Sequence, residues 1–176
     1  MNIYTRYRMQ LELAGFEDQV TIPKGFQVRT ISDADMEEQL DALAILEIDG
    51  YRDTVDYRLR PELSSIQTTK SFFQRLFSNV RGVFYQDLSF KLLSEGHICG
   101  AIYTFDSRPV AYIADFVIDP EFRGHGLGEL LLRHTLMRYK QDGFQQAGLA
   151  VTARNLPALN LYEKLGFEIV DTFTVG

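Results

Sequence analysis

Three closely spaced glycines could bind an anion through the main chain. Gly124, Gly126 and Gly128 follow an apolar stretch that ends at Ile118, and they precede residues 129–132 (Glu-Leu-Leu-Leu), which are typical of a helix. Glycine has no Cβ, so a ligand can approach its backbone closely, and the first N–H groups of a helix have no intrahelical acceptor. Because the helix dipole adds partial positive charge at the same point, the segment predicts a phosphate or pyrophosphate site.

The spacing of the glycines excludes two better-known nucleotide-binding motifs. A dinucleotide fingerprint requires Gly-x-Gly-x-x-Gly, but Glu129 or Leu131 stands where the third glycine belongs, and the Gly-Lys-Ser/Thr of a P-loop is absent. The pattern that fits is Arg-x-x-Gly-x-Gly, formed by Arg123, Gly126 and Gly128. It closely resembles the acyl-CoA-binding motif of the GNAT superfamily of N-acetyltransferases. Taken alone, the motif also suits a glycine-rich turn that binds nothing.

A second pattern further along the chain strengthens the resemblance. GNAT proteins carry Asn-x-x-Ala-x-x-x-Tyr-x-x-x-Gly-Phe, and this chain supplies Asn155, Ala158, Tyr162, Gly166 and Phe167 at that spacing. The residues also suit a helix on physical grounds, since Asn155 is a good N-cap and Gly166 stands where a helix ends in the left-handed conformation. Both motifs occur in the order that the superfamily shows.

The resemblance implies acetyl-CoA as cosubstrate, and it implies which residues hold it. In GNAT proteins, main-chain groups at the end of the fourth core strand pair with the amides of pantetheine, next to the glycine motif. The cofactor-binding residues that follow are Phe116, Val117, Ile118, Arg123, Gly124, His125, Gly126, Leu127, Gly128, Asn155 and Tyr162. The histidines show no metal-ligand spacing, so we predict no metal site.

Acetyl transfer to an amine requires a neutral nucleophile and a proton for the departing thiolate. The resemblance assigns the general acid to Tyr162. A tyrosine has an ordinary pKa of about 10, near enough to the value of about 8.5 for a thiol to make proton donation feasible. A tyrosine on the inner face of an amphipathic helix can equally be part of the core.

The general base has no clear motif. Ribosomal-protein N-terminal acetyltransferases carry a Glu on the strand before the second pattern, but Ala150 occupies that position here. Asp115, in an apolar strand, is the best remaining carboxylate, because partial burial would raise its pKa toward the useful range. The alternative for Asp115 is a hydrogen-bonded or solvent-facing strand residue, and Tyr112 with a water chain is another route. Asp119 is predicted to shape the turn into the glycine motif.

Composition narrows the class of protein. A chain of 176 residues that is 45% hydrophobic suits one domain over residues 1–176. Its net charge of -6 argues against nonspecific binding to nucleic acid or to an anionic membrane. No apolar run matches a signal peptide or a membrane span, and we infer a cytoplasmic protein. The lone Cys99 lies in an apolar run and is predicted to belong to the core.

The elements expected around these residues are those of the GNAT fold. We predict an α/β domain with a mixed central sheet, splayed at the cofactor site and flanked by helices on both faces. Strands are expected at 26–32, 88–94, 97–105, 110–118, near 149 and at 167–175. Helices are expected at 33–48 with Asp33 as cap, at 62–77, from the glycine turn to about 141, and from 156.

The N-terminus departs from the usual pattern. GNAT proteins generally close with two strands after the Gly-Phe pair, whereas one is visible here. Residues 7–13 (Tyr-Arg-Met-Gln-Leu-Glu-Leu) alternate polar and apolar side chains, which predicts an extra strand within an N-terminal extension of residues 1–25. An unpaired final strand would be an exposed edge. We therefore expect the extra strand to pair with the C-terminal region, within one chain or across a homodimer.

The acceptor is the part of the function that the sequence leaves open. Asp49, Tyr51, Asp53, Asp56 and Tyr57 would suit a cationic amine through charge and cation–π contacts, although a solvated loop also explains them. A small amine, an amino acid and a protein N-terminus all stay open. The favoured function is transfer of an acetyl group from acetyl-CoA to a primary amine, by direct attack in a ternary complex. The alternatives are a catalytically inactive CoA-binding regulatory domain and a partner-binding GNAT-like module.

Overall fold

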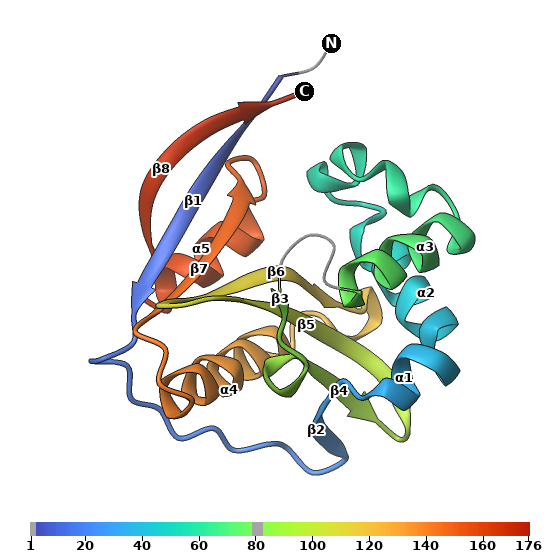
Figure 1. Ribbon diagram of the computed structural model, residues 1–176, viewed down its shortest axis with the longest axis horizontal. Helices are drawn as coiled ribbons and strands as arrows, with labels where there is room; N and C mark the ends of the chain where they lie inside the picture. The colour runs from blue at the N-terminus through green and yellow to red at the C-terminus, as the bar shows by residue number, and fades with distance from the viewer. Residues whose placement is uncertain (1–2, 79–82) are drawn as a thin grey trace.

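A mixed sheet runs through the centre of the protein (Figure 1). The structure is a computed structural model that describes residues 3–78 and 83–176, and within these residues the sheet has eight strands. The strands are β1 (Tyr4–Glu12), β2 (Phe26–Thr30), β3 (Val83–Phe84), β4 (Phe90–Ser94), β5 (His97–Ser107), β6 (Val110–Ile118), β7 (Gln146–Thr152) and β8 (Glu168–Val175). The α-helices are α1 (Asp33–Glu38), α2 (Leu40–Tyr51), α3 (Ile66–Phe77), α4 (Leu127–Gln141) and α5 (Leu156–Lys164). Short 3-10 helices are η1 (Val55–Leu59), η2 (Pro61–Ser64), η3 (Gln86–Leu88) and η4 (Pro120–Phe122).

The parallel pair β6 and β7 lies near the middle of the sheet. The strand order is β2-β4-β5-β6-β7-β1-β8, with β3 beside β5, and the other neighbouring pairs are antiparallel. The parallel pair contains only three residue pairs, from Val110–Gln146 to Tyr112–Gly148. Beyond them the two strands continue without pairing to each other. The predicted splay is therefore present, and it opens a gap between the C-terminal halves of β6 and β7.

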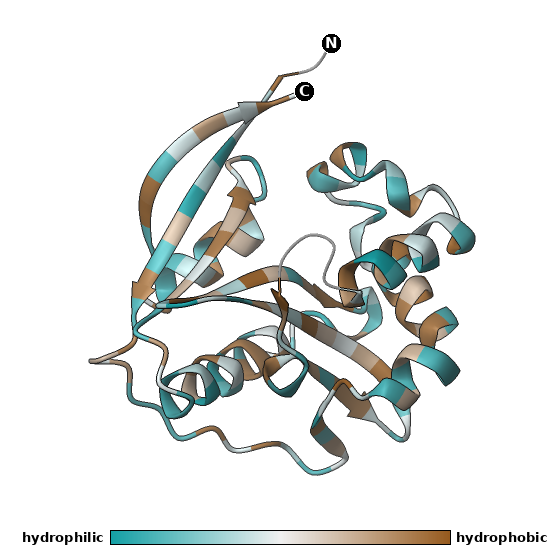
Figure 2. Ribbon diagram, viewed as in Figure 1, coloured by the Kyte–Doolittle hydropathy of each residue, from teal (hydrophilic) through white to brown (hydrophobic). Residues whose placement is uncertain are grey.

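Two hydrophobic clusters cover the two faces of the sheet. Alternation along β5 separates them, because Ile102 belongs to one cluster whereas Ala101 and Tyr103 belong to the other. Helices α4 and α5 contribute to the first cluster, and α2 and α3 contribute to the second. Figure 2 shows the central strands largely brown, between helices that carry teal on their outer sides. The prediction of helices on both faces is confirmed.

The helix predicted over 33–48 is divided. Its N-cap is Ser32, which forms a capping box with Asp35, rather than Asp33. At Gln39 the φ angle is -113°, outside the helical range, so α1 ends before it and α2 begins after it.

A second serine divides the helix predicted over 62–77. The Ser65 side chain accepts a hydrogen bond from the Thr68 amide at 3.2 Å and caps α3, while the residues before it form η2. The later elements lie close to their predicted bounds, from the β4–β5 hairpin to β8.

The N-terminal strand β1 lies between β7 and β8 and pairs with both (Figure 1). The pairing is antiparallel and occurs within one chain, and it makes β8 the edge strand of the sheet. The strand begins at Tyr4, three residues earlier than predicted. Met9 in β1 and Leu13 just after it are fully buried. β1 is therefore part of the hydrophobic core.

Replacing Met9 with alanine should lower the free energy of unfolding by about 2–5 kcal/mol, the usual cost of such a truncation in a core. Val170 on β8 is 52% exposed, so Val170→Ala is the control and should change stability by less than about 0.5 kcal/mol. Urea denaturation measures both variants. A loss at Met9 no larger than the loss at Val170 would show that β1 contributes little to the core.

Candidate active site

A cavity of about 540 Å³ opens between the diverging ends of β6 and β7. Its walls include the end of α2, η1, the glycine turn before α4, and α5. His125, although predicted to belong to the site, is exposed and lies outside the wall. The predicted site residues that line the cavity are Asp115, Phe116, Val117, Ile118, Arg123, Gly124, Gly126, Leu127, Gly128, Asn155 and Tyr162.

The glycine turn leaves the first amides of α4 without acceptors. Gly124 and Gly126 have φ angles of 78° and 75°, in the left-handed region that favours glycine. Gly126 is the N-cap and has no side chain to offer, and the first helical bond runs from the Leu130 amide to the Gly126 carbonyl. Within the described residues, the amides of 127–129 make no hydrogen bond. They provide the donors that a phosphate needs.

The Arg123 side chain links this turn to the end of α2 by hydrogen bonds. Its Nε donates to the Ile118 carbonyl at 3.1 Å, and its Nη2 donates to the Gly50 carbonyl. Gly50 lies so near β6 that a Cβ there would be 2.1 Å from Val117 Cγ2. Only glycine permits this approach, which brings the next residue, Tyr51, against β6.

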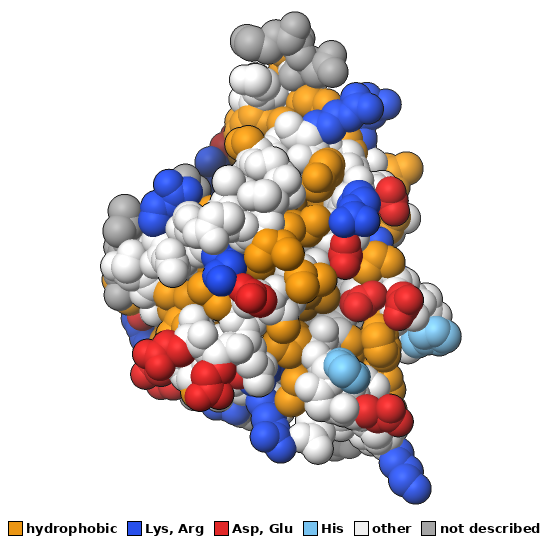
Figure 3. Space-filling view, turned by 90° about the vertical axis from the view of Figure 1, so that its right-hand side faces the viewer, with side chains coloured by type: hydrophobic (Ala, Val, Ile, Leu, Met, Phe, Trp, Pro, Cys, Tyr) orange, Lys and Arg blue, Asp and Glu red, His pale blue; other side chains and the backbone are white. Residues whose placement is uncertain are grey.

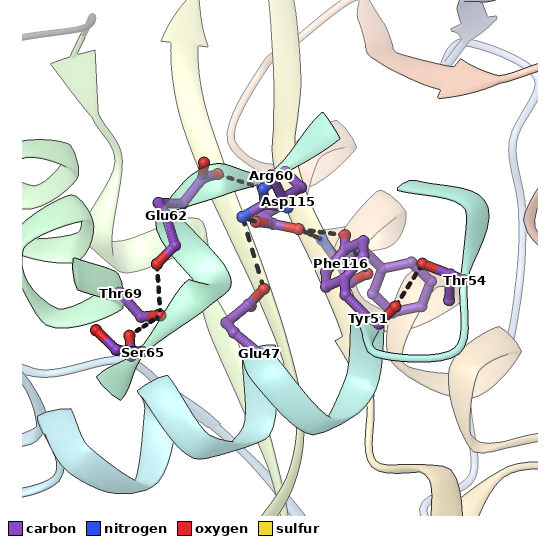
Figure 4. Close-up of polar contacts among 9 residues, drawn as sticks. All are labelled: Glu47, Tyr51, Thr54, Arg60, Glu62, Ser65, Thr69, Asp115 and Phe116. Atoms are coloured by element: carbon purple, nitrogen blue, oxygen red, sulfur yellow. Dashed lines mark hydrogen bonds and ion pairs between the residues drawn. The ribbon is translucent and has the colours of Figure 1, made fainter. Parts of the chain in front are cut away.

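Asp115 lies at the centre of a hydrogen-bonded cluster (Figure 4). Its Oδ1 accepts from the Tyr51 hydroxyl at 2.5 Å and from the Phe116 amide at 2.9 Å. Its Oδ2 accepts from Arg60 Nη2 at 2.7 Å. Arg60 also pairs with Glu62, and its guanidinium lies 4.7 Å from the centroid of the Tyr51 ring. Three donors therefore fix the Asp115 carboxylate in place.

Glu47 is buried behind this cluster. It is 0% exposed, and neither carboxylate oxygen has a hydrogen-bond partner within the described part of the chain. Arg60 Nη2 lies 3.9 Å from Glu47 Oε2. Burial and repulsion by Asp115 raise the pKa of Glu47 well above its ordinary value, and the attraction of Arg60 offsets this only in part. The buried setting therefore favours the neutral, protonated form of Glu47.

Tyr162 reaches the cavity from α5. The residue is 8% exposed, and its ring packs against Phe167 with centroids 5.8 Å apart. No residue that the structure describes hydrogen-bonds to the hydroxyl. Burial raises the pKa of Tyr162, and the charges of Asp115 and Asp56 add to the effect. The phenol therefore keeps its proton at neutral pH, although the shift carries its pKa further from that of a thiol than the ordinary value is.

A strap, residues 54–60, joins the two diverging strands. Asp56 in the strap accepts a hydrogen bond from the Thr152 hydroxyl at the end of β7. At the other end of the strap, Arg60 pairs with Asp115 on β6. Because these contacts lie on opposite sides of the gap, the strap closes part of the cavity and contributes charged groups to its wall.

Several of these side chains were missed by sequence reasoning. Of the acidic and aromatic segment, Tyr51 and Asp56 line the cavity, and the other three residues do not. Arg60 lies in no motif. Glu47 could have been found from its spacing. It lies one helical turn before Tyr51 and therefore shares a helix face with a residue of the predicted acceptor segment.

Other residues singled out in the sequence have structural roles. Cys99 is fully buried, its thiol donates to the Leu92 carbonyl at 3.5 Å, and burial raises its pKa to about 11. It is a core residue, as predicted. Asn155 is the N-cap of α5, and Asp119 Oδ1 accepts from the Glu121 amide at 2.9 Å at the start of η4.

Among the residues described, no three His, Cys, Asp or Glu side chains are grouped to hold a metal ion. None of the described helices is long and apolar enough to cross a bilayer.

Sequence comparisons relate the chain to acetyltransferases. The model of the family described as "Acetyltransferase (GNAT) family" matches residues 53–167. The mycothiol acetyltransferase of Saccharomonospora viridis is 36% identical over 88 residues, which are 45% of this chain and 29% of that protein. The [ribosomal protein bS18]-alanine N-acetyltransferase of Escherichia coli K12 is 31% identical over 94 residues, which are 53% of this chain and 62% of that protein. The chain thus matches less than two thirds of either relative.

Solved structures show the same fold. The GCN5-related N-acetyltransferase of Sphaerobacter thermophilus superposes with a TM-score of 0.74 at 19% identity, over 98% of this chain and 50% of that one. The PaiA N-acetyltransferase of Thermoplasma acidophilum, solved in complex with coenzyme A, superposes with a TM-score of 0.62 at 19% identity, over 83% of this chain and 91% of that one. At such identities the likeness shows the fold alone.

The raised pKa of Glu47 should make wild-type stability fall with pH relative to a Glu47→Gln variant. Above the unfolded pKa, the folded state holds a proton that the unfolded state releases, so folding takes up a proton and loses up to about 1.4 kcal/mol per pH unit. Urea denaturation between pH 5 and 7 should show the stability of Glu47→Gln rising steadily relative to wild type. Glu163→Gln, on the exposed side of α5, should follow the wild-type slope. Parallel profiles for wild type and Glu47→Gln would mean that Glu47 holds no extra proton.

Proposed function

Because the chain belongs to the acetyltransferase (GNAT) family, we propose that it transfers an acetyl group from acetyl-CoA to a primary amine by direct attack in a ternary complex. Residues 1–176 would act as one domain, with residues 1–25 as an extension that supplies β1. The observation that carries the proposal is the presence, in one cavity, of amides at the start of α4 and a tyrosine hydroxyl on α5 that have no hydrogen-bond partner among the described residues. The acceptor would be a small molecule or a protein N-terminus.

The residues present suit acetyl-CoA. The amides of 127–129 are assigned to the pyrophosphate, with Arg123 and the exposed His125 beside it. The main chain of β6 is assigned to the pantetheine amides, since beyond Tyr112 it has no partner strand on the side of the gap. The Phe116 and Ile118 carbonyls each accept one side-chain hydrogen bond, and a carbonyl oxygen has a second lone pair for a ligand.

Tyr162 is the proposed general acid. The amine nitrogen attacks the thioester carbonyl carbon, the C–S bond breaks, and the departing thiolate takes the proton of the Tyr162 hydroxyl. Burial keeps that proton in place at neutral pH, and no described side chain competes for it. The amine loses its own proton during the step, so charge balances when the phenol is reprotonated.

Asp115 is the proposed acceptor of the amine proton, directly or through a water molecule. It lines the cavity, and Arg60 and Tyr51 hold its carboxylate in a fixed position. Tyr112, the alternative in the sequence, does not line the cavity. Phe116 follows Asp115 in the chain, and its main-chain amide donates to the Asp115 carboxylate. The proposed proton acceptor would therefore lie next to the main-chain groups that are assigned to pantetheine.

Two observations favour other functions on the same fold. The oxygens of Asp115 are already occupied by three donors, which would suit a CoA-binding regulatory domain without turnover. On the face that carries α1 to α3, hydrophobic side chains form a band bordered by acidic and basic groups, which would suit a partner-binding module (Figure 3). Turnover of acetyl-CoA with any amine separates the proposed enzyme from both.

Gly126→Trp should abolish binding of acetyl-CoA, because the indole would occupy the space in front of the unpaired amides. Gly143→Trp is the matched control, since Gly143 also has a left-handed φ and open space around its Cβ position but lies at the far end of α4. Both variants carry the same strain, of about 1–2 kcal/mol, so a general loss of stability affects them equally. Calorimetric titration with acetyl-CoA and with desulfo-CoA measures binding. No binding by the intact chain would reject the cofactor site.

Tyr162→Phe should lower kcat for acetyl transfer by about 10²–10⁴-fold, the usual contribution of one acid–base group. Affinity for acetyl-CoA and stability should stay near wild type, because the hydroxyl has no partner among the described residues. Tyr112→Phe is the control, since burial also raises the pKa of Tyr112 but the residue lies outside the cavity. Stopped-flow or colorimetric detection of CoA release measures kcat. An unchanged kcat in Tyr162→Phe would remove this residue from the mechanism.

A further inference from the structure

Three of the six charged side chains that line the cavity form ion pairs within the described residues. Asp115 pairs with Arg60, and Glu129 pairs with two basic side chains of α4 and α5. Asp56 differs, because it forms no ion pair with any residue that the structure describes. It is therefore the one carboxylate of the described wall whose charge has no direct counter-ion.

Asp56 is held by neutral groups. It is 8% exposed, and it accepts hydrogen bonds from the Thr152 hydroxyl and from Asn155 Nδ2, the latter at 2.6 Å. Hydroxyl and amide donors orient a carboxylate but do not cancel its charge. A buried carboxylate of this kind favours a cation beside it, because the low dielectric of the site strengthens their attraction.

Arg6 on β1 is a cation of the same cavity wall that forms no ion pair within the described residues. Its Nη2 donates to the Ala150 carbonyl at 3.1 Å. Its Nε is buried without an acceptor, again within the described residues. An unsatisfied buried donor destabilises a protein, and a charged one does so more strongly, so the site gains when a ligand anion pairs with this guanidinium. Arg123 also lacks a carboxylate, but it is bound to main-chain carbonyls on the β6 side.

These two unpaired charges lie on the same wall. Arg6 and Thr152 are register partners of β1 and β7, so their side chains are neighbours, and Thr152 donates to Asp56. Both charges also act on Tyr162. Burial is the main cause of its raised pKa, and Asp56 adds to the shift while Arg6 opposes it. A cation and an anion that form no ion pair within the described residues therefore both act on the proposed general acid.

We propose that the acceptor is a free amino acid, whose ammonium binds Asp56 and whose carboxylate binds Arg6. The inference rests on the proposed function and names its substrate class. A zwitterion satisfies both groups at once, whereas a simple amine leaves Arg6 unpaired. A peptide N-terminus also leaves it unpaired, because an amide replaces the carboxylate next to the amine. The ammonium first loses one proton to water, and the neutral amine that remains attacks the thioester. Asp56 sets where that nitrogen lies.

Binding to the intact chain tests the inference without requiring turnover. The twenty proteinogenic amino acids are titrated one at a time by calorimetry, with and without desulfo-CoA, which has no thioester to react. For the amino acid that binds most tightly, the α-amide removes the carboxylate and the 2-hydroxy acid removes the ammonium. Each should bind about tenfold or more weakly, the effect of one charge-assisted hydrogen bond.

Two variants test which protein charge binds the carboxylate of the ligand and which binds its ammonium. Arg6→Gln should weaken binding of the amino acid and of the hydroxy acid about tenfold and leave the amide unchanged. Asp56→Asn should weaken the amino acid and the amide and leave the hydroxy acid unchanged. An asparagine can still accept from Asn155 and donate to Thr152, so this variant keeps both hydrogen bonds. Arg8→Gln on β1 and Asp53→Asn next to the strap lie outside the cavity and are the matched controls.

The outcomes separate this inference from the proposed function. Binding of no amino acid, or equal binding of the α-amide, would overturn the inference. Acetyl transfer with equal efficiency to amines that lack a carboxylate would overturn it too, and would leave the proposed function standing. Binding of an amino acid with the ligand-selective losses above, but without acetyl transfer, would support the inference and contradict the proposed function.

Discussion

The divergence of β6 and β7 is the constraint on which the site depends. After Tyr112 and Gly148 the strands no longer pair, and main-chain groups that would have bonded across the sheet need other partners. Side chains from distant elements take that place: Tyr51 donates to the Phe116 carbonyl, Arg123 to that of Ile118 and Arg6 to that of Ala150. The gap is thus held open by specific hydrogen bonds, and the same side chains line the cavity that it creates.

A shortage of positive charge shapes the region behind the cavity. Arg60 is shared by three carboxylates, those of Glu47, Glu62 and Asp115, and its guanidinium lies over the ring of Tyr51. One guanidinium cannot balance three ionised carboxylates in a buried setting, and the raised pKa of Glu47, which favours its neutral form, relieves the excess of negative charge. Arg60 Nη2 lies 2.7 Å from Asp115 Oδ2 but 3.9 Å from Glu47 Oε2. The position of Asp115 is therefore fixed more firmly than that of Glu47.

Local geometry made much of the fold predictable from the sequence. The turn at Gly124 and Gly126 and the cap at Asn155 depend on residues near in the chain, so their spacing was informative. The serine caps were missed because the apolar pattern continues through them. The roles of Arg60 and Arg6 depend on contacts across 55 and 144 residues, with Asp115 and Ala150 respectively, and no spacing rule covers such distances. Periodicity indicated the strand β1, but not that it lies between β7 and β8.

The place of β1 in the sheet also determines when the site can be assembled. During synthesis β1 emerges well before its partners β7 and β8, so its apolar side chains have no sheet to pack against until those strands follow. Pairing over such a sequence separation has a high loop-closure cost and slows folding. Met9 is fully buried in the finished sheet, so its side chain has no core to enter before β7 and β8 have been synthesised. The part of the cavity wall that carries Arg6 consequently needs β7 in place before it can form.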